Sequence, residues 1–451
     1  MTRIISLPRA ARAALLGFAV VGLFACSTVD SLLEVNNPAQ IAEEQLDDES
    51  LVNTLVASVV GDFQAAYDDP FVWRGSFFTD MQITAINWEQ TARLSQRIVK
   101  YDEGDADGMF AALSRARQQA DSISGRLKNL LATPSSDARL ATTLAYAGYS
   151  YIILADAMCE ATVNVSSEIY QPLELYQFAV DKFDEALPIA QSAGDSDLTN
   201  LIKVGLTRAH LNLGNASQVT ANAAGVPADF MWYAEYDGSD SRVYNVLEGR
   251  TAGSNHSLGM HPAFLAGGGN DALFGTQDLD AYLTDPRVQH TPSWTFGHNV
   301  LTKLYKPKAG LMYSNYNGET YAAGGSPAGF ERGSDIAFAS GLEAQHNMYE
   351  AMGPTAATLD FVNARRAVGN QAPVNLSGND LMMELHDQRG RDLFLAGNRL
   401  GDLRRWLRGG VDLFPSGNHP TEEWGAYGTA TCYPLPLGEY EGNPNISNPN
   451  S

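Results

Sequence analysis

Residues 388–406 read Gln388-Arg389-Gly390-Arg391-Asp392-Leu393-Phe394-Leu395-Ala396-Gly397-Asn398-Arg399-Leu400-Gly401-Asp402-Leu403-Arg404-Arg405-Trp406. The first part of this run continues a helix that the sequence predicts from about Asn379 to Ala396. Ser377 and Asp380 have the spacing of a capping box, with Asp in place of Glu or Gln, and Gly397 suits the carboxyl-terminal cap. The surrounding region, residues 334–408, therefore reads as helical.

A second helical region, residues 39–213, shows the spacing of helices that pack closely in pairs. In one predicted helix small and large apolar residues fall at i, i+3, i+7, i+10, i+11 and i+14, which is one face of a helix. They are Tyr176, Ala179, Phe183, Ala186, Leu187 and Ala190. The next predicted helix runs from Leu198 to Leu213, before a capping Gly214, and an earlier one spans residues 140–158. Such helix pairs resemble tetratricopeptide repeats, although their period is loose.

Residues 214–333 differ from both helical regions in being rich in Gly, Asn, Tyr and Trp, and residues 226–333 lack a sustained helical period. Glycines and asparagines are interleaved with aromatic residues there, a composition that favours long loops with short strands. An insertion of this length without regular structure is usually functional. A tail rich in Pro and Gly, residues 409–451, follows the later helical region.

The amino terminus has the features of a secretory signal. Three arginines and no acid precede a run of thirteen apolar residues, which as a helix is only about 20 Å long and too short for a ~30 Å hydrocarbon core. Leu23-Phe24-Ala25-Cys26 resembles a bacterial lipobox, although Phe24 is bulky for its position. We expect residues 1–25 to be removed and Cys26 to carry acyl chains such as palmitate, whereas the alternative is an ordinary cleaved signal with an incidental cysteine. Ser27 stands where an inner-membrane retention signal has Asp, so the expected location is the outer membrane.

The chain is strongly acidic. Removal of residues 1–25 would change its formal net charge from −22 to −25. This charge argues against binding to nucleic acid, which needs clustered Lys and Arg, and against electrostatic docking to anionic lipid. The acyl chains are then the only membrane anchor that we expect.

Lipidation of Cys26 would leave two further cysteines, Cys159 and Cys432. Outside the cytosol such a pair favours a disulfide. Two buried free thiols are the alternative.

The run 388–406 resembles the signature of the SusD/RagB family, whose pattern is roughly E-R-x-x-E-L-x-x-E-G-x-R-x-x-D-L-R-R-W. The matching residues are Arg389, Asp392 (in place of Glu), Leu393, Gly397, Arg399, Asp402, Leu403, Arg404, Arg405 and Trp406. Gln388 and Ala396 depart from the pattern, because the family prefers Glu at both positions.

Other parts of the family pattern follow in the same order along the chain. They are Glu34-Val35-Asn36-Asn37-Pro38, Asp285-Pro286-Arg287, Glu343 with Glu350-Ala351, Asn363-Ala364-Arg365-Arg366, and Tyr433-Pro434-Leu435-Pro436-Leu437-Gly438-Glu439 followed by Asn443-Pro444-Asn445. Ser340 stands where the family usually has Arg. The resemblance covers almost the whole mature chain, and the order and spacing of these parts make it fairly specific.

SusD/RagB proteins are lipid-anchored nutrient-binding partners of TonB-dependent outer-membrane transporters. The resemblance therefore implies a mainly α fold with tetratricopeptide-like helix pairs, a loop-rich region and short strands. It implies a lipidated stem at residues 26–38, a single SusD-like domain over residues 39–451 and a SusC-like β-barrel partner. Because a lone buried charge is costly, we expect the matched charges to be scaffold that ties helix ends and the tail together. These residues are Arg389, Arg391, Arg399, Asp392 and Asp402.

No motif points to catalysis or to a cofactor. The chain has no His-Glu-x-x-His and no Cys-x-x-Cys. The glycine-rich runs at 267–272 and 324–328 lack the strand context of a dinucleotide-binding loop or a nucleophile elbow, and residues 103–108 resemble only half a calcium loop. We expect no catalytic residue, no metal ligand and no cofactor.

Binding of a sugar needs aromatic faces for its C–H surfaces and polar side chains for its hydroxyls. Residues 71–90 and 294–316 combine both, and in the resembling family ligand contacts tend to come from loops in these two parts. The candidate ligand-binding residues are Trp73, Arg74, Trp88, Trp294, Tyr313 and Tyr316. Each has a position in the core as its alternative.

The predicted function is capture of an oligomeric nutrient, with an oligosaccharide favoured, at the cell surface. The ligand would then pass to the barrel without any reaction. The alternative is a helical-repeat lipoprotein scaffold that binds a peptide or an assembly partner.

Overall fold

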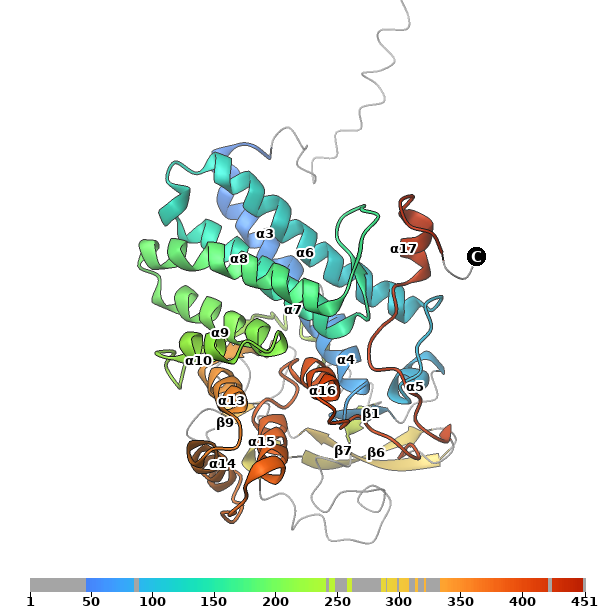
Figure 1. The fold of residues 1–451 in the computed structure, drawn as a ribbon. Coiled ribbons are helices and arrows are strands. Elements are labelled where there is room, and N and C mark those ends of the chain that lie inside the picture. The colour runs from blue at the N-terminus through green and yellow to red at the C-terminus, as the bar shows by residue number, and fades with distance from the viewer. Residues whose placement is uncertain are drawn as a thin grey trace, which may run out of the picture. The chain divides into compact units, whose positions relative to one another are not determined.

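The computed structural model (Figure 1) describes most of the helical regions and parts of the loop-rich region. The described residues are 46–84, 89–240, 243–247, 258–261, 285–288, 290–297, 300–307, 313–314, 320–321, 333–420 and 424–448, with the backbone alone described for 258–260, 290–297, 300–307, 313–314 and 320–321. The chain divides into two units, Met1–Leu51 and Val52–Ser451. The predicted signal, Cys26 and the predicted boundary at residue 39 lie outside the described residues.

Successive helices of the second unit pack side by side. They are α3 (Val52–Ala66), α6 (Gly104–Leu130), α7 (Ala138–Ala157), α8 (Pro172–Ala193), α9 (Ser196–Asn212) and α10 (Ala216–Ala223). The sequence neighbours α6 and α7, α7 and α8, α8 and α9, and α9 and α10 are each in contact, and α3 lies against both α6 and α7. This arrangement confirms the predicted helix pairs (Figure 1).

Phe183 of α8 explains why these helices approach so closely. Its ring is completely buried and lies against Gly148 of α7 and Gly205 of α9. A Cβ atom at Gly148 would come within 2.6 Å of the ring, and one at Gly205 within 2.3 Å. The two glycines therefore provide the space in which one aromatic ring joins three helices.

Gly205→Ala is expected to destabilise the protein, because its methyl group would overlap the rigid ring of Phe183. Overpacking of this kind costs about 1–3 kcal/mol. The matched control is Gly125→Ala in α6, where nothing lies within 4 Å of the added Cβ; this change should stabilise by up to about 1 kcal/mol, through helix propensity. Urea unfolding of both variants tests the pair, and a Gly205→Ala protein as stable as the unmodified chain would contradict the packing described.

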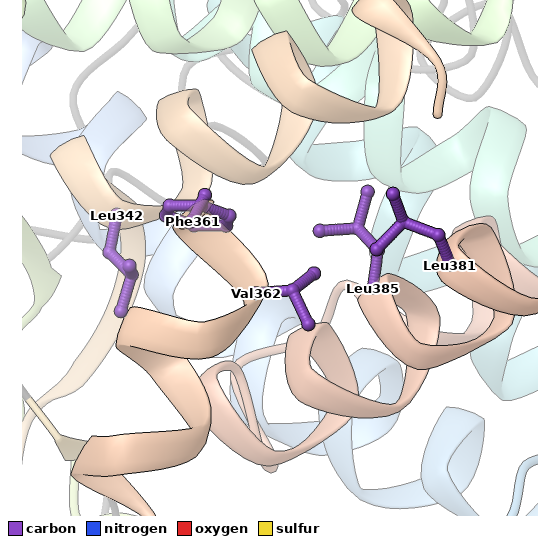
Figure 2. Close-up of a cluster of buried hydrophobic side chains, with 5 residues drawn as sticks. All are labelled: Leu342, Phe361, Val362, Leu381 and Leu385. Carbon is purple, nitrogen blue, oxygen red and sulfur yellow. The ribbon is translucent and has the colours of Figure 1, made fainter. Parts of the chain in front are cut away.

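The later helices form a second layer around their own apolar cluster. They are α13 (Gly341–Met352), α14 (Ala356–Val368), α15 (Gly378–Asp392) and α16 (Arg399–Arg408). The cluster consists of Leu342, Phe361, Val362, Leu381 and Leu385, and Figure 2 shows Val362 of α14 facing Leu385 of α15. This layer joins the first one because α13 packs against α9 and α10, and α16 packs against α7.

Short helices and two-stranded sheets complete the described structure. The short helices are η2 (Glu49–Leu51), η3 (Tyr67–Val72), α4 (Trp73–Phe77), α5 (Glu89–Ser95), η4 (Pro134–Ser136), η7 (Pro286–Val288) and α17 (Leu437–Gly442). The antiparallel strand pairs are β1 (Gln82–Thr84) with β5 (Leu258–Met260), β2 (Ala161–Thr162) with β3 (Ile169–Tyr170), β4 (Met231–Ala234) with β10 (Ile336–Ser340), β6 (His290–Gly297) with β7 (Val300–Pro307), and β8 (Tyr313–Ser314) with β9 (Thr320–Tyr321). Short strands in the loop-rich region were expected. Within the part of the chain that the structure describes, each helix is either too short or not apolar enough to span a bilayer.

Helix α15 ends at Asp392, four residues earlier than the sequence predicts. Residues 393–396 form a buried turn instead, and the Ala396 carbonyl accepts a 2.6 Å hydrogen bond from the Tyr67 hydroxyl. Gly397 follows with a φ of +81°, and a Cβ there would lie 2.6 Å from that hydroxyl. The prediction of a helix to Ala396 was wrong, because the chain turns early around Tyr67 to start α16.

The matched charges of the signature are buried and paired. Asp392 is the centre of one group. The Arg365 guanidinium of α14 donates to both carboxylate oxygens of Asp392 at 2.7 Å, and the Arg287 guanidinium of η7 donates to one of them at 3.0 Å. The Nε2 atom of His346 in α13 lies 2.7 Å from the other oxygen. Burial alone would raise the pKa of Asp392, but the Arg365 and Arg287 guanidiniums hold it well below its usual range. One carboxylate thus connects four elements.

A second group forms around Asp402 of α16. Arg389 of α15 donates to it at 2.6 Å and Arg405 at 2.9 Å. Arg405 also binds both oxygens of Glu350 at 2.8 Å, and the Trp406 indole donates to the same carboxylate at 2.9 Å. The parts of the family pattern that lie far apart in sequence therefore meet as ion pairs, which confirms their expected role as scaffold between helices.

The tail is held by the disulfide that the cysteine pair favours, and not by the signature charges. Cys159, just after α7, is bonded to Cys432, and the backbone N–H of Cys159 donates to the Tyr433 carbonyl at 2.8 Å. The Arg97 guanidinium donates to the carbonyls of Pro415 and Ala430. The disulfide, the backbone hydrogen bonds and the Arg97 side chain, rather than the signature charges, fasten the carboxyl-terminal segment.

Candidate functional site

Trp73 lies inside the structure at the start of α4. The chain bends just before it, because Asp69 leaves helical geometry within η3. Trp73 is only 7% exposed, and its ring packs edge-on against Phe77 at a centroid distance of 6.1 Å. The expectation of an exposed platform is therefore wrong for Trp73, because the bend directs this part of α4 into the core.

Arg74, the next residue, lies at the boundary between core and surface. Its side chain is 21% exposed and forms ion pairs with Asp105 at 3.0 Å and with Asp69 at 3.4 Å. The guanidinium also lies 5.3 Å from the centroid of the Trp73 ring. Two carboxylates thus orient Arg74 while a fifth of its side chain remains accessible to a solute.

The structure brings the two predicted ligand segments to one side of the fold. β1, at the end of α4, pairs with β5 through Gln82 opposite Met260. β5 contacts β7, and β7 pairs with β6, which contains Trp294 opposite Lys303. Figure 1 shows β1, β7 and β6 close together below α16 and α5. Residues 82–84 and 300–307 thus both lie against β5, although more than 200 residues separate them in sequence.

The remaining candidates are located only in part. Trp294 lies in β6 and Tyr313 in β8, where it is opposite Tyr321; only the backbone is described at these positions. Trp88 and Tyr316 lie outside the described residues. Their role in ligand binding stays a prediction.

The half calcium loop at residues 103–108 is the start of a helix. α6 begins at Gly104, and Glu103 pairs with Arg93 at 2.7 Å. Among the described residues no group of three or more His, Cys, Asp or Glu side chains could hold a metal ion. An arginine partner and a helical backbone are unlike the oxygen cage that calcium needs.

Asp68 is a buried carboxylate that sequence reasoning missed. It is 2% exposed, and its carboxylate accepts hydrogen bonds from the backbone N–H groups of Asp69 and Val246, each at 2.7 Å. Burial raises its pKa to about 7. Asp68 anchors a piece of the loop-rich region to the helical core. Its sequence context, an acidic pair in an acidic chain, carries no signal for this role.

Solved structures resemble the whole arrangement. Neither a family model nor a curated protein matches the sequence. A SusD homolog from Bacteroides thetaiotaomicron VPI-5482 superposes with a TM-score of 0.63 at 14% identity, over 89% of this chain and 97% of that one. A SusD superfamily protein from Bacteroides vulgatus ATCC 8482 superposes with a TM-score of 0.62 at 13% identity, over 89% of this chain and 98% of that one.

The chain has the SusD-like fold. A third solved structure, a SusD-like carbohydrate binding protein from Bacteroides vulgatus ATCC 8482, covers 79% of this chain and 83% of its own at a TM-score of 0.55 and 12% identity. The SusD-like fold confirms the architecture that the sequence resemblance implies: mainly helical, with paired helices and short strands. At these identities the likeness concerns the fold, so the ligand has to be argued from this chain's own residues.

Proposed function

We propose that this protein is a SusD/RagB-type lipoprotein of the outer membrane that binds an oligosaccharide at the cell surface. It would deliver the oligosaccharide to a TonB-dependent, SusC-like β-barrel without making or breaking a bond. The observation that carries the proposal is the likeness to SusD-like structures over almost their whole length, 97% and 98% for two of them. One of the similar structures is described as carbohydrate binding.

The sequence supports the anchoring part of the proposal. Residues 1–25 have the pattern of a secretory signal, and Cys26 follows the lipobox-like run. A single acyl chain binds membranes only marginally, so stable anchoring needs more than one chain. An acidic protein carried in this way depends on its lipids rather than on surface charge.

The ligand-facing part of the proposal is supported by the meeting of β1, β5, β7 and β6. Through β5, this side of the fold connects residues 82–84 of the first predicted ligand segment to β7 and β6, and both predicted segments combine aromatic and polar side chains. We propose Arg74, Trp88, Trp294, Tyr313 and Tyr316 as ligand contacts there. Trp73 is only 7% exposed, so we do not propose it as a contact.

Co-purification tests the transfer step. The tagged full chain is extracted from its native membrane in mild detergent and purified, and the bound proteins are identified by mass spectrometry. We expect a large β-barrel protein to co-purify in a near-stoichiometric amount. We also expect the Cys26→Ser variant to be absent from the membrane fraction. Recovery of the lipidated chain as a monomer alone would contradict the proposal of a barrel partner.

A further inference from the structure

An open hollow of about 630 Å³ is lined in part by Tyr440 of α17. Three segments that are distant in sequence line it: residues 99–102 before α6, residues 159–160 after α7, and the tail around Pro434 and Tyr440. We call it the tyrosine hollow after Tyr101 and Tyr440. Its volume falls within the range of small-molecule sites, about 300–1,000 Å³.

The walls of the tyrosine hollow are fastened to one another. Leu437 donates its backbone N–H to the Tyr101 carbonyl at 2.7 Å, and Cys159 donates to the Tyr433 carbonyl at 2.8 Å. Cys159, itself a lining residue, is also joined to Cys432 by the disulfide. Figure 1 shows α17 beside the amino-terminal end of α6. A hollow held in this way is largely preformed, so a ligand need not order it.

The lining combines aromatic, apolar and acceptor groups. Tyr101, Tyr440 and Pro434 are partly exposed in the lining, whereas Leu435 is buried beneath it. Burial and the nearby Glu160 carboxylate raise the pKa of Tyr440, so its hydroxyl stays protonated and can donate. Aromatic rings cover C–H faces, while hydroxyl and carboxylate groups bond to polar edges.

The charges in the hollow disfavour an anionic ligand and leave carboxylates that can accept hydrogen bonds. Asp102 and Glu160 contribute two carboxylates and Lys100 one ammonium group. The Lys100 side chain is 63% exposed and lies 4.0 Å from Glu103, so it offers an anion little more than a solvated charge. Two carboxylates with a lysine beside them also suit a metal ion poorly. Neutral hydroxyl groups, in contrast, can donate to both carboxylates.

The tyrosine hollow adjoins the environment of Arg74. The Tyr433 hydroxyl, beside the lining residue Pro434, donates to the Arg74 carbonyl at 3.1 Å. Asp105, three residues after the lining residue Asp102, pairs with the Arg74 guanidinium. The hollow and the predicted ligand segment that begins at residue 71 are therefore parts of one region of the fold.

We propose that the tyrosine hollow binds a short stretch of a neutral oligosaccharide. The rings of Tyr101 and Tyr440 contact the sugar C–H faces, and the Glu160 carboxylate accepts hydrogen bonds from the sugar hydroxyls. This inference rests on the proposed function as a carbohydrate receptor. It adds a binding surface in the carboxyl-terminal tail, outside residues 71–90 and 294–316.

Calorimetric titration of the full chain with a panel of neutral oligosaccharides (malto-, cello-, xylo- and laminari-hexaose) tests the inference. For the sugar that binds, Tyr101→Ala and Tyr440→Ala should each raise the Kd by about tenfold, as expected for aromatic anchors. Tyr440→Phe, which keeps the ring, should retain most of the affinity. Glu160→Ala should weaken binding, whereas the control Glu185→Ala should not, because Glu185 pairs with Lys128 between α8 and α6.

Three outcomes distinguish this inference from the function on which it rests. Weakened binding in the tyrosine variants, with the thermal midpoint and the disulfide unchanged, supports the hollow. Unchanged binding in every hollow variant overturns the hollow and leaves the receptor proposal intact. Failure of the unmodified chain to bind any neutral oligosaccharide overturns both. If Tyr440→Ala lowers the stability of the protein, the binding result for Tyr101→Ala is decisive. The Tyr101→Ala variant keeps the hydrogen bond from Leu437, because that bond is accepted by the backbone carbonyl of residue 101.

Discussion

Asp392→Ala is expected to lower the free energy of unfolding by about 3–5 kcal/mol, the usual cost of breaking a buried ion pair. The substitution removes a fully buried carboxylate and leaves Arg287, Arg365 and His346 without the group that they share. Both arginines are almost completely buried, so water cannot replace the lost carboxylate. Since domains are typically stable by about 5–15 kcal/mol, we expect a partly unfolded variant. Guanidinium unfolding followed by circular dichroism measures the difference.

The matched control is Asp387→Ala on the same helix. Asp387 pairs with Arg391 at 2.8 Å, but its side chain is 43% exposed. An exposed i,i+4 pair contributes about 0.3–0.5 kcal/mol. If Asp392→Ala were no more destabilising than Asp387→Ala, the buried group around Asp392 would not have the structural role described.

Acid should unfold the protein through the same carboxylates. Arg389 and Arg405, acting against burial, hold the pKa of Asp402 below its usual range, as Arg365 and Arg287 do for Asp392. A carboxylate with a lowered folded-state pKa stabilises the fold above its unfolded pKa of about 3.9, and the contribution is lost as the pH falls below that value. We therefore expect unfolding free energy to fall steeply below about pH 4. In the Asp392→Ala variant the unfolding free energy should fall less steeply with decreasing pH. An equally steep fall in the variant and the unmodified chain would refute the role given to Asp392.

Loss of the disulfide is the second change with a large expected effect. Cys159 and Cys432 are 273 residues apart, so the bond constrains a very long loop in the unfolded chain. The chain-entropy model gives about 5 kcal/mol for such a loop, with measured values often lower. The Cys159→Ser/Cys432→Ser double variant should unfold at a markedly lower denaturant concentration than the unmodified chain.

The disulfide also has a local effect that a second measurement isolates. The bond joins the end of α7 to the segment that carries α17, and the remaining fastening there consists of backbone bonds such as Leu437 to Tyr101. In the double variant amide hydrogen exchange should rise in residues 424–448 before it rises in α8. Two free thiols in the unmodified chain under non-reducing conditions, or unchanged exchange in the tail, would contradict this role.

Local periodicity was sufficient to predict much of the helical structure. The spacing from Tyr176 to Ala190 reflects a real buried face, and Phe183 on that face does fill the gap between neighbouring helices. The signature charges were predictable as scaffold for a physical reason, since buried Arg and Asp side chains need partners. Their individual partners were not, because residue types alone do not show that Arg365 and Arg287 converge on Asp392.

Long-range contacts account for what the sequence did not show. Trp73 reads as part of an aromatic and polar platform, but a bend at Asp69 directs it into the core. The turn at 393–396 depends on Tyr67, more than 300 residues earlier. The pairing of β1 with β5 and the tyrosine hollow likewise depend on segments that meet only in the folded chain. No tryptophan or glycine-rich run marks Tyr101 or Tyr440 as binding residues.

As a receptor of the proposed kind, the protein would hold an oligosaccharide without altering it. The most direct test incubates the purified full chain with neutral oligosaccharides and, in parallel, with peptides of similar size. Binding is measured by calorimetry and the recovered ligand by mass spectrometry. We predict saturable binding of at least one oligosaccharide, recovered at its original mass, and no binding of the peptides. Binding of peptides alone, or recovery of shortened sugar products, would contradict the claim.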